Sequence, residues 1–327
     1  GETYPFTHIS GTAVIYKVVQ AYTSRYHAQD VHVHQAIRSL VLLVGISTIS
    51  DVMPMLDENR YFVQESVDML NRFIEGHTVD RVISYDDSPL GCYYRGVDLL
   101  AYTLNKHNKL RYGITPDTFG FTIGPILNSP RRMVGESVLG FSLFQVKRSD
   151  LTNPENAQEP VLSDVLFALN EERKVVVRQL TGALMDQIDS EQVVSSSVFN
   201  VVTDAGIAGL LAGSFTTRFK LPSIAFSVRK KDGETFDMEN LDPMSVINVD
   251  AVGRGTLVSG SGRAPEWFDL HGFLTLIDRD YPGLLVKWGG HEQAAGLSIR
   301  AENFPMFKSL FVARLELVVA EQVVLAK

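Results

Sequence analysis

The sequence predicts an α/β protein made of two α/β lobes that a long helix joins around a cleft. Two segments, VVSSSVFNVV and LPSIAFSV, have the composition of buried strands, and the small-residue segment AGIAGLLAGSFTTRF between them has that of a helix. This strand, helix, strand order is typical of parallel pairing. The longest helical pattern runs from Val161 to Ile188, directly after the linker-like segment DLTNPENAQEP, residues 150–160. We therefore divide the chain into residues 1–160, a connecting helix 161–188 and residues 189–327.

The first part of the chain is predicted to hold helices around a buried strand. Residues 9–22 have small and apolar residues at helical spacing, which predicts a buried helix. The apolar run VLLVGI, residues 41–46, has the length of a core strand. Apolar residues then recur at helical spacing from Phe62 to Phe73. Gly, Pro and Asn gather in residues 111–135, which predicts a loop with short ordered pieces.

Composition excludes several classes of protein. A length of 327 residues favours two domains, and a hydrophobic content of 45% with 21% charged residues is typical of a globular protein. The single Cys92 excludes an internal disulfide and a zinc site made of thiolates. We find no apolar stretch of membrane-spanning length and no secretory signal at the N-terminus, so we expect a cytoplasmic protein without a membrane partner.

The net charge of -8 argues against a surface covered with cationic, phosphate-binding side chains. An acidic protein can still bind nucleic acid if its cations gather in one groove and metal ions supply local positive charge. Composition alone therefore does not predict a nucleic-acid partner.

The segment GISTISDVMPMLDENR, residues 45–60, carries one carboxylate after an apolar run. If that run is a strand, Asp51 follows its end, which is where open α/β sheets place their ligands. Alternatively, Asp51 is the N-cap of the next helix.

Two further segments have a structural alternative. FTIGPILNSPRRMVG, residues 121–135, is a Gly/Pro turn with two arginines, which a solvated surface loop would also explain. TDAGIAGLLAGSFTTRFKLPSIAF, residues 203–226, has small residues that suit close helix packing, and its helix N-terminus suits an anion.

The last two candidate segments contain several glycines each. They are GSGRAPEWFDLHGFL at residues 260–274 and KWGGHEQAAGLSI at residues 287–299. Glycine allows a phosphate to approach the backbone, and arginine offers it a forked donor. Arg263 could instead form a structural ion pair with Asp269 or Glu266.

Together and in this order, these segments resemble RecJ-type enzymes of the DHH phosphoesterase family, from about Tyr4 to Leu315. GSGR and GGH with AAG resemble the DHH-associated domain of that family. This sequence departs from the family pattern at Ile126, at Pro130 with Arg131, and at Asp204, which stands where the family has a histidine.

The resemblance implies residues 1–160 as the C-terminal part of a DHH domain and residues 189–327 as the DHH-associated, substrate-binding domain. It implies a hydrolase that degrades single-stranded DNA from the 5′ end, with Mn2+ or Mg2+ in a two-metal site. Single-strand-binding or recombination proteins are the partners it suggests. The residues it implies are Asp51 and His291 as catalytic, Asp51 as metal ligand, and Ser261, Arg263, Gly289, Gly290, His291, Asn128 and Arg132 as substrate-binding.

The aspartate-rich and Asp-His-His motifs of that family do not occur in this sequence. His32 and His34 form the nearest histidine pair, and we interpret them as solvent-facing. Asp51 alone cannot hold two metal ions and a hydroxide, so we expect the sequence to omit an upstream part. Two alternatives stay open: a phosphodiesterase for oligonucleotides or cyclic dinucleotides, and a catalytically inactive DNA-binding scaffold.

Overall fold

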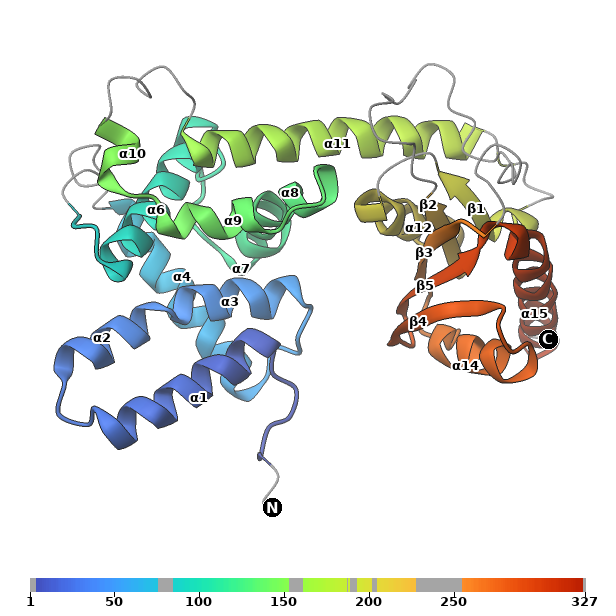
Figure 1. The fold of residues 1–327 in the computed structure, drawn as a ribbon, viewed down its shortest axis with the longest axis horizontal. Helices are drawn as coiled ribbons and strands as arrows, with labels where there is room; N and C mark the ends of the chain where they lie inside the picture. The colour runs from blue at the N-terminus through green and yellow to red at the C-terminus, as the bar shows by residue number, and fades with distance from the viewer. Residues whose placement is uncertain are drawn as a thin grey trace. The chain divides into compact units, whose positions relative to one another are not determined.

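The computed structural model describes residues 4–75, 85–152, 161–186, 188, 193–201, 205–227 and 255–325 (Figure 1). The chain divides into two compact units. The first unit holds Gly1–Pro130 and Glu136–Glu171, and the second holds Arg131–Gly135 and Glu172–Lys327. Five strands form one mixed sheet, so the predicted α/β class is confirmed. All strands within the described residues belong to the second unit.

The described part of the first unit is helical. Its helices are α1 (Gly11–Tyr26), α2 (Val31–Ser39), α3 (Val41–Ser50), α4 (Asp57–Glu75), α6 (Pro89–Lys106), α7 (Pro116–Thr118), the π-helix η1 (Phe119–Ile123), α8 (Gly124–Met133), α9 (Val138–Ser142), the 3-10 helix η2 (Leu143–Gln145) and α10 (Arg148–Thr152). α10 takes up the start of the predicted linker, and residues 153–160 lie outside the described residues.

The strand predicted over residues 41–46 is wrong, because these residues begin helix α3. The helix is apolar on several sides because two hydrophobic clusters take up its side chains: Val44 packs with Ala13 of α1, and Leu42 packs with Leu70 of α4. Gly45 allows α4 to come close, since a Cβ there would lie 2.1 Å from the Ser66 Oγ. A short apolar run does not distinguish a buried strand from a buried helix.

Two other expectations need correction. Helix α1 is not buried all round, because it exposes Ile15 by 66% and Val18 by 63% while it buries Ala13. Residues 111–135 hold more helix than the predicted loop with short ordered pieces, because α7, η1 and α8 follow one another there without a break. Pro125 is the second residue of α8, and the first turn is where a helix tolerates proline.

The segment Val31–Ser50 is long and apolar enough to cross a membrane by length and composition alone. The expectation that no apolar segment has membrane-spanning length is therefore wrong by length and composition. The segment consists of two helices, α2 and α3, and α3 buries side chains in the core of the first unit. A core helix passes the same test as a membrane span, so this feature is weak evidence for a membrane.

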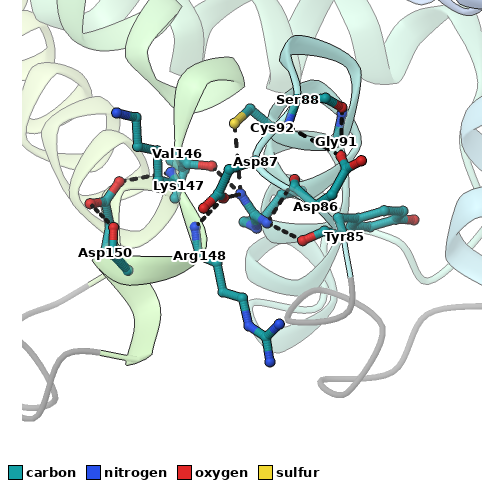
Figure 2. A network of polar contacts seen from close by, with 12 residues as sticks. Tyr85, Asp86, Asp87, Ser88, Gly91, Cys92, Val146, Lys147, Arg148 and Asp150 are labelled. Atoms are coloured by element: carbon teal, nitrogen blue, oxygen red, sulfur yellow. Dashed lines mark hydrogen bonds and ion pairs between the residues drawn. The ribbon is translucent and has the colours of Figure 1, made fainter.

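The fully buried guanidinium of Arg95 on α6 ties two segments of the first unit together (Figure 2). Nη1 donates to the carbonyl oxygen of Val146 at 2.6 Å and to the carboxylate of Asp87 at 3.0 Å. Nη2 donates to the carbonyl oxygens of Tyr85 and Asp86. Because its donors meet backbone carbonyls and one carboxylate, we interpret this network as structural.

The long helix predicted over 161–188 is present as α11 (Leu162–Asp186), and the unit boundary falls inside it, after Glu171. The second unit then continues with the 3-10 helix η4 (Ser195–Ser197), β1 (Val198–Val201), α12 (Ala205–Phe219), β2 (Ser223–Ser227), β3 (Leu257–Arg263), α14 (Leu270–Asp280), β4 (Leu285–His291), β5 (Ala294–Arg300), the 3-10 helix η5 (Ala301–Asn303) and α15 (Phe304–Leu325). The assignment of the two units to the family domains, and the cleft, stay predictions.

The sheet has the order β1-β2-β3-β5-β4. β1 and β2 are parallel, as the strand, helix, strand pattern predicted, and the other pairs are antiparallel. Helices α14 and α15 cover one face, where Phe273, Phe307 and Phe311 join the strand side chains in one core. On the other face α12 packs through Ala208 and Phe215 against Phe199 of β1.

Candidate functional site

Strand β3 turns its two polar candidates to the same face of the sheet. Val258, Gly260 and Gly262 are buried on the face that α14 and α15 cover. Side chains alternate along a strand, so Ser261 and Arg263 lie on the opposite face, where both are partly exposed. Their spacing of two residues along a strand accounts for this shared face.

The Arg263 guanidinium makes few bonds. Nη1 donates to the carbonyl oxygen of Gly262 at 2.7 Å and reaches the Ser261 Oγ at 3.4 Å. Among the described residues no carboxylate forms an ion pair with Arg263. Asp269, one of the two partners considered from the sequence, caps α14 through the N–H of Gly272. Since a guanidinium carries five N–H donors, Arg263 has donors left for a ligand.

Glycines of α12 bring this helix very close to β3 and to the end of α8. A Cβ on Gly209 would lie 2.7 Å from the Ser261 Oγ and 3.1 Å from Nη2 of Arg263, and one on Gly206 would lie 2.5 Å from the Cα of Arg132. Arg132 Nη1 donates to the carbonyl oxygen of Gly206 at 3.1 Å. The small residues of α12 are therefore a packing face, and this packing gathers three of the sequence segments.

Like charges gather at this point. Burial lowers the pKa of Arg132 from its ordinary value, and Arg173, Arg263 and Arg131 lower it further. Burial also lowers the pKa of Arg263. No described carboxylate pairs with Arg132. In a chain of net charge -8, these arginines form a local cationic site that suits an anion such as phosphate.

Strand register extends this site across the sheet. Arg263 lies opposite Ala294 of β5, which lies opposite His291 of β4. Cross-strand partners project to the same face, so exposed His291 shares the face of Arg263. Two strand spacings separate them, about 10 Å between Cα atoms. The structure thus places Ser261, Arg263, Arg132 and His291 in the second unit.

The open face, as we call it, consists of Ser259, Ser261 and Arg263 of β3, Ala294, Gly296 and Ser298 of β5, and Lys287, Gly289 and His291 of β4. Ser261 lies opposite Gly296, and Gly296 opposite Gly289. A Cβ on Gly289 would meet no described atom within 4 Å, and one on Gly296 would meet only the Gly260 carbonyl oxygen, at 4.0 Å. The backbone is therefore bare beside Ser261.

Gly290 has a different role from Gly289. Its φ of +144° is one that residues with a side chain rarely adopt, and a Cβ there would lie 2.3 Å from the carbonyl oxygen of Ala294. Gly290 thus shapes the β4–β5 hairpin that positions His291.

The remaining candidates lie in the first unit. Asp51 is exposed and is the C-cap of α3, so it follows a helix rather than the predicted strand and does not start the next helix. Its Oδ2 accepts from the Ser47 Oγ at 3.1 Å. Gly124 of α8 packs against Ser50, the neighbour of Asp51, and exposed Asn128 lies one helical turn farther along α8.

The metal role of Asp51 now rests on the resemblance alone. Asn59, which follows Asp51 in the same segment, is buried and donates to the carbonyl oxygens of His8 and Pro54, so its role is structural. Asp204 lies outside the described residues.

Sequence reasoning missed Arg173 and Gly296 as members of the site. Arg173 lies within the helical pattern of α11 and carries no local signal. Gly296 lies within AAG of a quoted segment, but only the strand register shows that it faces Ser261.

No family model matches the chain. It is 27% identical over 280 residues to the single-stranded-DNA-specific exonuclease RecJ of Escherichia coli (strain K12), covering 83% of this chain and 39% of that protein. It is 23% identical over 318 residues to RecJ of Bacillus subtilis (strain 168), covering 94% of this chain and 31% of that protein. The chain thus spans well under half the length of these curated relatives.

The solved structures that match this chain are also RecJ proteins. The crystal structure of RecJ in complex with Mn2+ from Thermus thermophilus matches with a TM-score of 0.55 at 20% identity, over 85% of this chain and 33% of that one. A crystal structure of exonuclease RecJ bound to manganese matches with a TM-score of 0.50 at 21% identity, over 85% of this chain and 55% of that one. The chain therefore resembles RecJ-type single-stranded-DNA-specific exonucleases in sequence over most of its length and shares their fold.

Proposed function

We propose that the complete protein is a RecJ-like exonuclease that hydrolyses single-stranded DNA from the 5′ end, and that the second unit holds the DNA backbone on the open face. The observation that carries this proposal is the partly buried Arg263 guanidinium beside Ser261 and Arg132, with no carboxylate partner among the described residues. A desolvated, unpaired cation costs free energy, and a bound phosphate would offset that cost.

Each residue of the site then has a role in binding. The Ser261 hydroxyl and the Arg263 guanidinium bind one phosphate, and Arg132 adds positive charge from the end of α8. His291 contacts the strand from β4, and bare Gly289 allows the backbone to come close. Gly290 keeps the hairpin in shape. The roles of Asp51 and Asn128 in the first unit rest on the resemblance.

A divalent cation is the cofactor we propose for the complete protein, because the related RecJ structures contain Mn2+ or Mg2+. A two-metal site needs several carboxylates and imidazoles. Within the described ranges no three His, Cys, Asp or Glu side chains lie together, so these residues do not fit such a site by themselves. The contribution that we assign to them is binding and orienting the phosphate backbone.

Two rival functions make different predictions. A phosphodiesterase for short oligonucleotides or cyclic dinucleotides would prefer the shortest substrates. The acidic net charge of the chain favours this rival. A catalytically inactive scaffold would bind single strands without cleaving them. We further propose a cytoplasmic location and interaction with single-strand-binding or recombination proteins, as the resemblance implies.

The test is a cleavage assay of the complete protein with manganese or magnesium on end-labelled single strands of increasing length. We expect nucleotides to be released from the 5′ end, with faster cleavage of long strands than of dinucleotides and no cleavage of duplex DNA. Preference for dinucleotides would favour the first rival. Binding without cleavage at any metal concentration would favour the second.

A further inference from the structure

The three strands of the open face carry no acidic residue: β3 reads LVSGSGR, β4 reads LVKWGGH and β5 reads AAGLSIR. Arg263 of β3 and Lys287 and His291 of β4 project to the open face. Arg263 and Ser261 lie at one end of this surface on β3. On β4, the outer strand of the described sheet, Lys287 and His291 lie at the other end.

The position of Lys287 follows from register and burial. Trp288 is partly buried and packs against the core that α14 and α15 cover. Its neighbour Lys287 therefore projects to the open face, where it lies opposite Ser298, and Ser298 lies opposite Ser259. Lys287 is exposed and forms no ion pair with a described residue. A solvated lysine on a face whose three described strands carry no carboxylate is available to an anion.

Lys287 and His291 lie on either side of bare Gly289, each two residues away along β4. Two residues of strand span about 7 Å, a distance that a lysine side chain can cover. Ser261, Gly296 and Gly289 form one cross-strand row. A ligand held at Ser261 and Arg263 can therefore extend over two bare residues to a position between Lys287 and His291.

We propose that Lys287 forms, over Gly289, a second phosphate position of a bound single strand, separate from the position at Ser261 and Arg263. This inference rests on the proposed function and narrows its substrate class. The two positions are two strand spacings apart, about 10 Å. A single strand with about 3.4 Å of rise per stacked nucleotide covers this span in two or three nucleotides. The site thus recognises a strand rather than a single nucleotide.

The test compares Lys287→Gln with wild type in two binding measurements on the full chain, with a chelator present to prevent cleavage. One is direct binding of a 5′-phosphorylated octathymidylate at several salt concentrations. The other is competition by thymidine 5′-monophosphate, which fills one phosphate position only. Arg314→Gln is the matched control, because it removes one exposed charge from α15, the helix that packs on the opposite face.

We expect Lys287→Gln to weaken octanucleotide binding about three- to tenfold and to reduce its salt slope by about 0.7. Competition by the mononucleotide should stay unchanged, and Lys287→Arg should restore affinity. Arg263→Ala should weaken the binding of both the octanucleotide and the mononucleotide.

Two outcomes overturn the second position: Lys287→Gln behaving like Arg314→Gln, or Lys287→Gln weakening both ligands equally. If wild-type protein binds no octanucleotide, the proposed function itself fails, and that result is distinct from both.

Discussion

Gly209 of α12 and Ser261 of β3 lie so close that a Cβ on the glycine would stand 2.7 Å from the Ser261 Oγ. The helix thereby constrains the position of the Ser261 hydroxyl, because any side chain at residue 209 must displace that hydroxyl or the helix. Gly213 lies one turn farther along the same helix, and a Cβ there would stand at an ordinary 3.9 Å from Cγ of Arg263.

These two glycines give a matched pair of alanine variants. Gly213→Ala should raise the free energy of unfolding by about 0.5 to 1 kcal/mol, because alanine favours a helix and restricts the unfolded chain. Gly209→Ala should lack this gain and should weaken single-strand binding, while Gly213→Ala binds like wild type. Thermal unfolding and titration with a labelled oligonucleotide measure both effects. Equal affinity of the two variants would show that the Gly209 contact does not position Ser261.

Arg263→Ala should weaken single-strand binding by about one to two orders of magnitude, the size of a lost charge-assisted hydrogen bond. Its removal should also lower the salt slope by about 0.7, since one phosphate contact of a single strand is lost. Binding is measured at several salt concentrations, with the unfolding temperature as a check of the fold. A lower affinity with an unchanged salt slope would mean that Arg263 acts on stability and does not touch phosphate.

Asp51→Asn should abolish cleavage by the complete protein while the fold and single-strand binding persist. The side chain is exposed and bonds to the Ser47 hydroxyl, so an amide of the same shape fits without strain. Asp68→Asn, an equally exposed change on α4, is the control. Cleavage retained with manganese would refute the metal role of Asp51.

In the second unit, the order of β1, α12 and β2 could be predicted from the sequence, because both strands lie in short apolar runs. β3, β4 and β5 could not, since glycine and polar residues interrupt their apolar pattern. The shared orientation of Ser261 and Arg263 follows from a spacing of two. The first unit could not, since the run Val41–Ile46 suits a buried strand and a buried helix equally. The placement of Gly296 and His291 beside Ser261 and Arg263 depends on cross-strand register, and the contact of Arg132 with Gly206 depends on tertiary packing. No local pattern contains either.

Asp87 predicts a pH dependence of stability in the first unit. The backbone N–H of Arg148 and the Arg95 guanidinium hold the pKa of Asp87 below its ordinary value. A depressed folded-state pKa stabilises the fold above the unfolded pKa of about 3.9, and this contribution is lost as the pH falls through the folded value. Asp87→Asn should therefore be less stable than wild type at neutral pH, with a difference that shrinks in acid. Thermal unfolding across this range tests it, and a difference that is constant with pH would exclude an ionic role.

Glycines on the two faces of the sheet should respond in opposite ways to alanine. Gly260 faces the core, where a Cβ would lie 2.8 Å from the buried Phe226 ring and 2.9 Å from Leu297. Gly260→Ala should therefore destabilise the fold by about 1 to 3 kcal/mol through overpacking. Gly296 faces outward with no described atom closer than 4.0 Å to a Cβ. Gly296→Ala should raise the free energy of unfolding by about 0.4 to 1 kcal/mol, because glycine weakens a strand.

The effect of Gly296→Ala on binding should be opposite to its effect on stability. If the strand passes over the row from Ser261 to Gly289, a methyl group on Gly296 obstructs it, so Gly296→Ala should weaken octanucleotide binding although it stabilises the fold. Thr275→Ala, an exposed change on α14, should leave affinity unchanged. A bulkier Gly296→Val should weaken binding further, and an affinity independent of side-chain size at residue 296 would place the nucleic acid elsewhere on the second unit.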